Sequence, residues 1–176
     1  MIKNKYLKIL IFFVLIFYSN IGLSNNPVKF IDMEFLMNNS LAGRSIIDQL
    51  DKVSKNYNVS FKKKEEDFKK KEIEIVSKKK ILNESDFKKE VEFFNKQVSD
   101  YKITRKKKLN NLSKIKNQAQ KKLADKLNLI LIDYSKKNSI EYIIAKQAIV
   151  IGETESDLTK KILVILNSEI KKIKLK

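Results

Sequence analysis

Residues 81–101 read ILNESDFKKEVEFFNKQVSDY. Asn83 and Ser85 are typical helix caps, because their side-chain oxygens accept hydrogen bonds from the free N–H groups of a first helical turn. Residues 83–86 form the only plausible break between two long helical patterns. After the break, apolar residues alternate at spacings of four and three at Phe87, Val91, Phe94, Val98 and Tyr101. The pattern predicts a helical hairpin arm over residues 40–137, with its tip near 83–86.

The limb before the tip has a weaker apolar pattern. Phe61, Phe68, Ile75 and Leu82 follow one another at intervals of seven, but the companion positions three or four further on are charged. This limb therefore offers only half of a heptad seam. At 1.5 Å per residue, limbs of roughly 43 and 50 residues would reach on the order of 60–75 Å. Such a hairpin must project from the rest of the chain.

Strand-like runs lie on both sides of the hairpin. Residues 28–32 alternate after Pro27, and the β-branched runs 140–145 and 148–151 indicate a strand pair around Lys146 and Gln147. Residues 154–157, TESD, fit a capping box that opens a closing amphipathic helix. We therefore predict an α+β fold, in which residues 25–39 and 138–176 form one small β-rich body.

That body is small enough to need partners. Three short strands and one helix lie near the lower limit of autonomous stability, and the edges of a small sheet are open to pairing with another chain. We therefore predict a homo-oligomer. The apolar residues that we expect in this oligomerisation body are Phe30, Ile31, Ile143, Ile144, Ile149, Ile151 and Leu158.

The composition excludes most catalytic chemistry. The 176 residues include 38 Lys and Arg against 21 Asp and Glu, a formal charge of +17, and contain no His and no Cys. Without these two residue types there is no Ser-His or Cys-His pair and no ordinary structural zinc site. The carboxylate clusters at 65–67 and 153–157 are interpreted as helix surface and helix capping. We predict no enzymatic activity, no metal and no cofactor.

The first 24 residues have the pattern of a cleavable signal peptide. Lys3, Lys5 and Lys8 precede an unbroken apolar run over residues 9–18, and Gly22-Leu23-Ser24 supplies the small residues that a signal peptidase recognises. The run is too short to cross a bilayer comfortably, which takes about 20 residues. We expect cleavage after Ser24 and export to the periplasm. An uncleaved N-terminal anchor is the alternative.

Two end segments carry a family resemblance. They are VKFIDMEFLMNNSLAGRSIIDQLDK (28–52) and IEYIIAKQAIVIGETESDLTKKILVILN (140–167), and they flank a long, charged helical hairpin. Together they resemble the Skp/OmpH family of periplasmic chaperones. The resemblance implies a homotrimer with a shared barrel-like body and three helical arms around a central cavity. It also implies ATP-independent binding of unfolded outer-membrane β-barrel proteins.

Positive charge is concentrated on the predicted arms. Residues 61–126 hold 22 basic and 11 acidic side chains, and residues 93–126 hold 11 basic residues against only Asp100 and Asp125. Such a field would steer an acidic, unfolded protein into the cavity. The client-binding residues that we expect are aromatic residues of the arm and one basic run, namely Phe61, Phe68, Phe87, Phe93, Phe94, Tyr101, Lys106, Lys107 and Lys108.

Alternatives remain at two levels. The arm aromatics could instead join one limb to the other, and the lysine runs could be only solvated helix surface. A second functional class is a basic coiled-coil envelope protein that binds anionic lipid headgroups, lipopolysaccharide or another polyanion without chaperone activity. Nucleic acid is not an expected partner, because only Arg44 and Arg105 are arginines and the chain carries an export signal.

Overall fold

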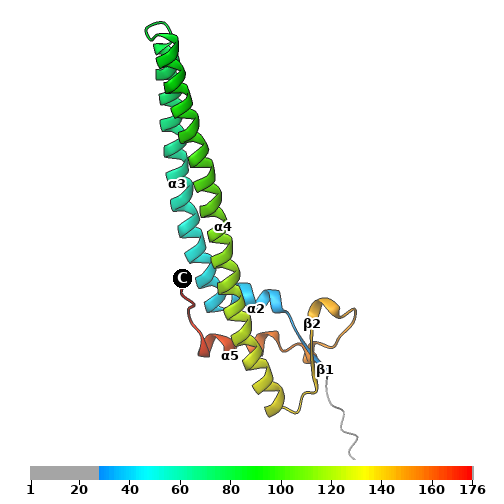
Figure 1. Cartoon of the computed structure of the whole chain (residues 1–176). Coiled ribbons are helices and arrows are strands. Elements are labelled where there is room, and N and C mark those ends of the chain that lie inside the picture. The colour runs from blue at the N-terminus through cyan, green and yellow to red at the C-terminus, as the bar shows by residue number, and fades with distance from the viewer. Residues whose placement is uncertain (1–27, 176) are drawn as a thin grey trace, which may run out of the picture.

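The computed structural model describes residues 28–175, which form a long helical hairpin on a small body (Figure 1). The predicted signal peptide and its cleavage site lie outside this range. Among the described residues no helix is long and apolar enough to cross a membrane. The elements in chain order are β1 (Val28–Ile31), α2 (Met33–Asn39), α3 (Leu41–Lys78), α4 (Glu84–Lys137), β2 (Tyr142–Ala145), η1 (Lys146–Ala148), η2 (Thr154–Ser156) and α5 (Thr159–Glu169), where η denotes a short 3-10 helix.

The arm consists of α3 and α4, which run antiparallel. Asn83 caps α4, because its side-chain oxygen accepts a hydrogen bond from the backbone N–H of Asp86 at 2.9 Å. The chain therefore turns at 79–83, and residues 84–86 already belong to the second limb. The limbs contain 38 and 54 residues. At 1.5 Å per residue, α4 is about 80 Å long and extends past α3 into the body.

A short helix that the sequence pattern did not predict, α2, precedes the arm. The Asp32 side chain accepts from the N–H of Phe35 at 2.8 Å and starts it. Ser40 both ends α2 and begins α3, since its hydroxyl accepts from the N–H of Gly43 at 3.0 Å. A Cβ added to Gly43 would overlap the carbonyl oxygen of Met37. Only glycine allows this close approach between the two helices.

The sheet differs from the prediction. β1 and β2 pair in parallel, with Val28 opposite Tyr142 and Ile31 opposite Ala145. The predicted second strand of the pair, 148–151, is wrong for the described chain: residues 146–148 form η1, and residues 149–151 form neither strand nor helix. The segment between the two runs lacks the Asn-Gly or Gly-containing turn that a tight hairpin needs. With two strands of four residues each, the body is mainly helical rather than β-rich.

The predicted capping box is also wrong. Residues 154–156 form η2, and α5 begins only at Thr159. Asp157 still acts near this helix start, because its carboxylate accepts from the N–H of Thr159 at 2.9 Å and pairs with Lys146 at 3.0 Å. Burial would raise the pKa of Asp157, but the hydrogen bonds from Thr159 and Lys146 together hold it below its ordinary value.

One aliphatic core joins the body to the root of the arm. It draws side chains from β1, α2, α3, α4 and α5, together with residues of the connecting segments. Its buried members are Ile31, Leu36, Ala42, Ile46, Ala119, Leu123, Leu127, Ile130, Ile140, Leu158, Ile162 and Leu166. Both ends of the described chain and both limbs of the arm are therefore packed into one unit.

Gly43→Ala should destabilise the protein by about 1–3 kcal/mol, the typical cost of forcing extra volume into a packed site. The added methyl group must push the backbone of Met37 and the Ser40 cap apart. Urea unfolding followed by circular dichroism measures the loss. The neighbouring Arg44→Ala at an exposed position is the matched control. Equal midpoints for the two variants would show that the close approach is not needed.

Candidate functional site

Aromatic side chains join the two limbs in the distal half of the arm. The Phe68 ring centroid lies 5.9 Å from that of Phe94 and 5.4 Å from that of Tyr101. Phe61 packs on Tyr101 at 6.2 Å and is buried. These are steep edge-to-face contacts, a favourable arrangement for aromatic pairs. Four of the predicted client-binding aromatics therefore join one limb to the other, which is the alternative role given for them above. They are Phe61, Phe68, Phe94 and Tyr101.

Cationic side chains cover the aromatic seam. The Arg105 guanidinium lies 5.3 Å from the Phe61 ring centroid and makes an ion pair with Glu65 at 3.2 Å. The Lys108 ammonium lies 5.4 Å from the Tyr57 centroid and 5.9 Å from that of Phe61. All three lysines of the run 106–108 are exposed, and within the run Lys108 is the one whose ammonium lies over aromatic rings.

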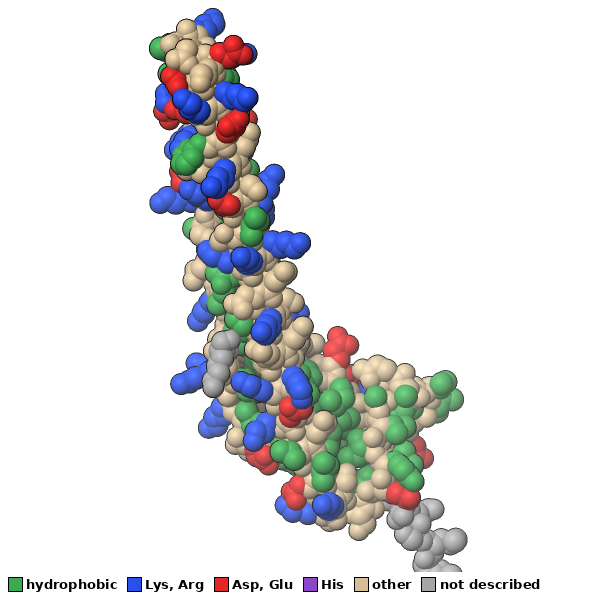
Figure 2. Space-filling model, in the orientation of Figure 1, with side chains coloured by type: hydrophobic (Ala, Val, Ile, Leu, Met, Phe, Trp, Pro, Cys, Tyr) green, Lys and Arg blue, Asp and Glu red, His purple; other side chains and the backbone are tan. Residues whose placement is uncertain are grey.

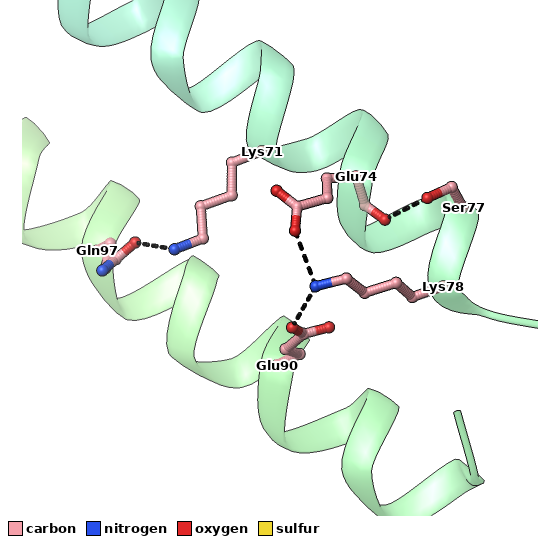
Figure 3. Close-up of polar contacts among 6 residues, drawn as sticks. All are labelled: Lys71, Glu74, Ser77, Lys78, Glu90 and Gln97. Carbon is pink, nitrogen blue, oxygen red and sulfur yellow. Dashed lines mark hydrogen bonds and ion pairs between the residues drawn. The ribbon is translucent and has the colours of Figure 1, made fainter. Parts of the chain in front are cut away.

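Polar side chains of α3 also bridge the limbs between Phe68 and the tip of the arm. Figure 3 shows the Lys78 ammonium between the carboxylates of Glu74, at 2.8 Å, and Glu90, at 3.0 Å. Hydrogen bonds with these carboxylates raise the pKa of Lys78. Lys71 donates to the Gln97 side chain at 3.4 Å. Ion pairs this exposed contribute little net stability, so we interpret them as setting the register of the limbs.

Tyr101 connects the aromatic and polar parts of the seam. Its hydroxyl donates to the Glu65 carboxylate at 2.8 Å while its ring packs on Phe61 and Phe68. Burial, followed by the hydrogen bond to Glu65, raises the pKa of the Tyr101 phenol. The neutral phenol is therefore the form that this seam accommodates.

A second set of apolar side chains lies on the arm outside the seam. Phe93 is 57% exposed, Ile73 is 70% exposed and Ile81 is 82% exposed, and Val76 is similarly open. Phe87 is half-buried. Of the predicted site aromatics, Phe93 alone is exposed. The sequence already sets Ile73 and Val76 apart, because they flank Ile75 and lie off the seven-residue spacing of Phe61, Phe68 and Ile75. No sequence pattern singled out Ile81.

The body carries its own apolar face. Figure 2 shows hydrophobic side chains gathered on the body, whereas Lys and Arg side chains are distributed along the arm. At the foot of α4, a groove of about 680 Å³ is lined mainly by apolar side chains from β1, α4 and β2. Val150 and Ile151 are almost fully exposed. Within residues 28–175 no strand pairs with the outer edge of β2.

The predicted oligomerisation residues divide into two groups. Phe30, Ile31 and Leu158 are buried in the chain's own body. The others reach the surface to different degrees: Ile143 and Ile149 are half-buried, Ile144 is 39% exposed and Ile151 is 93% exposed. The structure thus leaves the second group available for contact with another molecule.

Residues 27–166 match the family model of the OmpH-like outer membrane proteins. The chain belongs to the OmpH-like family. This match confirms the resemblance drawn from the two end segments. No curated protein matches the sequence. A crystal structure of an OmpH-like protein from Caulobacter crescentus, described as a candidate outer membrane chaperone, has the same fold, with a TM-score of 0.80 at 12% identity over 88% of this chain and 91% of that chain.

The arm is thus part of the OmpH-like fold, since the matched range includes all of α3 and α4. Within the described part of this OmpH-like chain, no three Asp or Glu side chains are grouped as metal ligands would be. The surfaces that stand out are the exposed apolar residues among the arm lysines and the apolar face of the body.

Phe68→Ala should loosen the distal arm, because it removes the ring that contacts both Phe94 and Tyr101. Replacing a fully buried Phe by Ala lowers the free energy of unfolding by about 3–5 kcal/mol. Phe68 is half-buried, so we expect about half of that loss. Hydrogen exchange of the amides of 61–101 measures the change. The exposed Phe93→Ala is the control: it loses only the contact of its ring with the Lys71 ammonium, at 5.6 Å, and should change exchange much less than Phe68→Ala does. Faster exchange in the control than in Phe68→Ala would contradict this assignment of the seam.

Proposed function

We propose that this chain is an ATP-independent holdase chaperone of the periplasm, which binds unfolded outer-membrane β-barrel proteins between the arms of a homotrimer and prevents their aggregation. The observation that carries the proposal is the set of exposed apolar side chains, Ile73, Val76, Ile81 and Phe93, on an arm that is otherwise densely basic. Membership of the OmpH-like family supports it, as does the chaperone description of the Caulobacter crescentus structure.

The two kinds of arm surface have complementary roles in this proposal. The 22 basic side chains of 61–126 attract an acidic, unfolded chain over a distance set by the ionic strength. The exposed apolar side chains then make short-range contacts. Complete burial of one such side chain contributes about 1.5–3 kcal/mol, so several partial contacts can hold a client without fixing its structure. Weak, multiple contacts also allow release without ATP.

The body supplies the features that a subunit interface needs. β2 has an open outer edge, and the exposed, β-branched residues Val150 and Ile151 follow it closely. A groove lined by Ile31, Ile132 and Ile144 lies between β2 and the foot of α4. We propose that 149–151 of one subunit pairs with β2 of the next and so forms a strand only on assembly. Three copies joined in this way would place three arms around one cavity.

The charge of the arm also supports a second candidate function. Residues 93–126 carry only Asp100 and Asp125 against 11 basic residues, which favours contact with anionic lipid headgroups or lipopolysaccharide. Such binding requires no exposed apolar side chains. The two functions therefore respond differently to changes at Ile73 and Phe93.

The double variant Val150→Asp with Ile151→Asp should be monomeric, because it places two carboxylates in the proposed apolar interface. Light scattering of the mature chain reports the mass, which should fall from that of a trimer to that of a single chain. Gln147→Asp, at an exposed position in η1, is the control and should remain trimeric. A wild-type chain that is itself monomeric would refute the trimer.

The mature chain should suppress the aggregation of an unfolded β-barrel membrane protein diluted from urea, at a near-stoichiometric amount of trimer. Ile73→Ser combined with Phe93→Ser should weaken this suppression, with unchanged helicity and mass, because both side chains are exposed. Val164→Ser is the matched control, since Val164 on α5 is as exposed as Ile73, at 70%. Turbidity measures the effect.

One outcome would overturn the chaperone proposal, and another would overturn only the role assigned to the exposed apolar side chains. The first is a wild-type chain that fails to suppress aggregation while binding anionic vesicles tightly, which would support the lipid-binding alternative. The second is suppression that remains complete in the Ile73→Ser, Phe93→Ser variant and disappears with added salt. That result would assign client binding to charge alone.

A further inference from the structure

The last residues of the described chain form an extended segment on the root of the arm. After α5, residues 170–175 (the tail) run back toward α3 (Figure 1). Ile170 has φ −135° and ψ 106°, which are values of an extended strand. The tail lies beyond residues 27–166 that match the family model.

A single side chain of α3 binds the backbone of the tail. The Gln49 amide nitrogen donates to the carbonyl oxygen of Ile173 at 2.8 Å, and the Gln49 carbonyl oxygen accepts from the N–H of Leu175 at 3.4 Å. A neighbouring strand would offer the same donor and acceptor to an extended chain. The contact therefore recognises backbone and sets no requirement on the side chains of the bound segment.

Gln49 is held in the orientation that this contact needs. Its amide nitrogen also donates to the carbonyl oxygen of Ser45 at 2.8 Å and lies 3.1 Å from the Ser45 hydroxyl. These contacts fix which end of the amide carries the nitrogen. The donor and acceptor are thus aligned by α3 itself.

The apolar side chains of the tail rest on the root of the arm. Ile170, Ile173 and Leu175 pack against the aliphatic core, whereas Lys171, Lys172 and Lys174 are exposed. Beside the tail, a groove of about 390 Å³ is lined by Ile170 and Ile173 of the tail and by Lys122, Asp125, Lys126 and Leu129 of α4. Leu129 remains 59% exposed. The seat therefore accepts branched apolar side chains at three positions of an extended segment.

We propose that this seat, formed by Ser45 and Gln49 of α3 and the adjoining surface of the aliphatic core, with the α4 groove around Leu129 beside it, is a binding site for extended apolar polypeptide segments. The tail occupies it in the free protein, and an extended segment of an unfolded client displaces the tail. The displacement rests on the proposed chaperone function, whereas the peptide site itself does not. Backbone recognition suits this role, because the clients of a holdase differ in sequence.

A tethered occupant competes with any segment from outside. The effective concentration of a segment on a short tether is on the order of millimolar. An external peptide with a dissociation constant of about 0.1 mM for the empty seat would therefore bind about tenfold more weakly while the tail is present.

The test uses a fluorescein-labelled peptide of residues 168–176, SEIKKIKLK, and measures its anisotropy. A chain that ends at Glu169 should bind it about tenfold more tightly than the full chain. Adding Gln49→Leu to the shortened chain should remove most of this gain, and the exposed Asp48→Asn is the matched control. A second peptide, SESKKSKSK, keeps the charges but lacks the apolar side chains, and it should not show the gain.

Ile173→Ser in the full chain provides a second way to open the seat, in case shortening disturbs the fold. It should also increase binding of the tail peptide. Equal binding to the full, shortened and Ile173→Ser chains would overturn the proposal, and so would equal binding of the two peptides. A shortened chain that suppresses client aggregation but does not bind the peptide would overturn this inference and leave the proposed function standing.

Competition tests the role of the client. A urea-unfolded β-barrel membrane protein, diluted into the shortened chain with bound peptide, should release the peptide and lower the anisotropy. Retention of the peptide in the presence of excess client would overturn displacement by clients.

Discussion

Parallel pairing of β1 with β2, over a shared aliphatic core, is the interaction on which the rest of the molecule depends. Val28 lies opposite Tyr142 although more than a hundred residues separate them in the chain. The hairpin makes this pairing possible, because α4 returns the chain to the point where α3 leaves the body. The entropy lost on closing a loop grows only slowly with its length. The fully buried side chains of Leu36, Leu127 and Leu166 offset that loss.

The stability of the arm changes along its length. At the root, Ala119, Leu123 and Leu127 are buried in the aliphatic core. Farther out, half-buried aromatic pairs and exposed ion pairs join the limbs, and buried residues such as Phe61 and Ile75 are sparse. Segments with few buried contacts open locally at low cost in free energy. We therefore expect the arm to deform more readily toward its tip than at its root.

The decrease in burial from root to tip also explains which apolar side chains of the arm are covered and which are exposed. Phe61, Phe68 and Tyr101 pack against one another in the seam, so their apolar surface is largely covered within the arm. Two narrow helices cannot cover every apolar position between them, so Ile73 and Phe93 remain exposed among the lysines. A basic surface with scattered apolar side chains stays soluble and still offers short-range contacts. The body keeps its apolar side chains together on one face, a feature typical of surfaces that contact another molecule.

The sequence by itself determined the helical hairpin, its capped turn at Asn83 and the family. These features are encoded locally, since a cap, a spacing of three or four, and a strand-like run each involve neighbouring residues. The short elements were not predicted correctly. Helix α2 has too few turns to show a periodic pattern, and the strand expected at 148–151 has no partner within the described chain.

Only the tertiary structure decided which surfaces are free. Phe93 and Phe94 are adjacent in sequence, yet Phe94 packs on the Phe68 ring of the facing limb, whereas Phe93 is 57% exposed and has only the Lys71 ammonium of that limb over its ring. The need for glycine at 43 comes from the close approach of the Met37 backbone, in α2, to the first turn of α3. Gln49 meets the tail across more than 120 residues. Such contacts depend on how distant segments meet in space, which no local pattern of residue types contains.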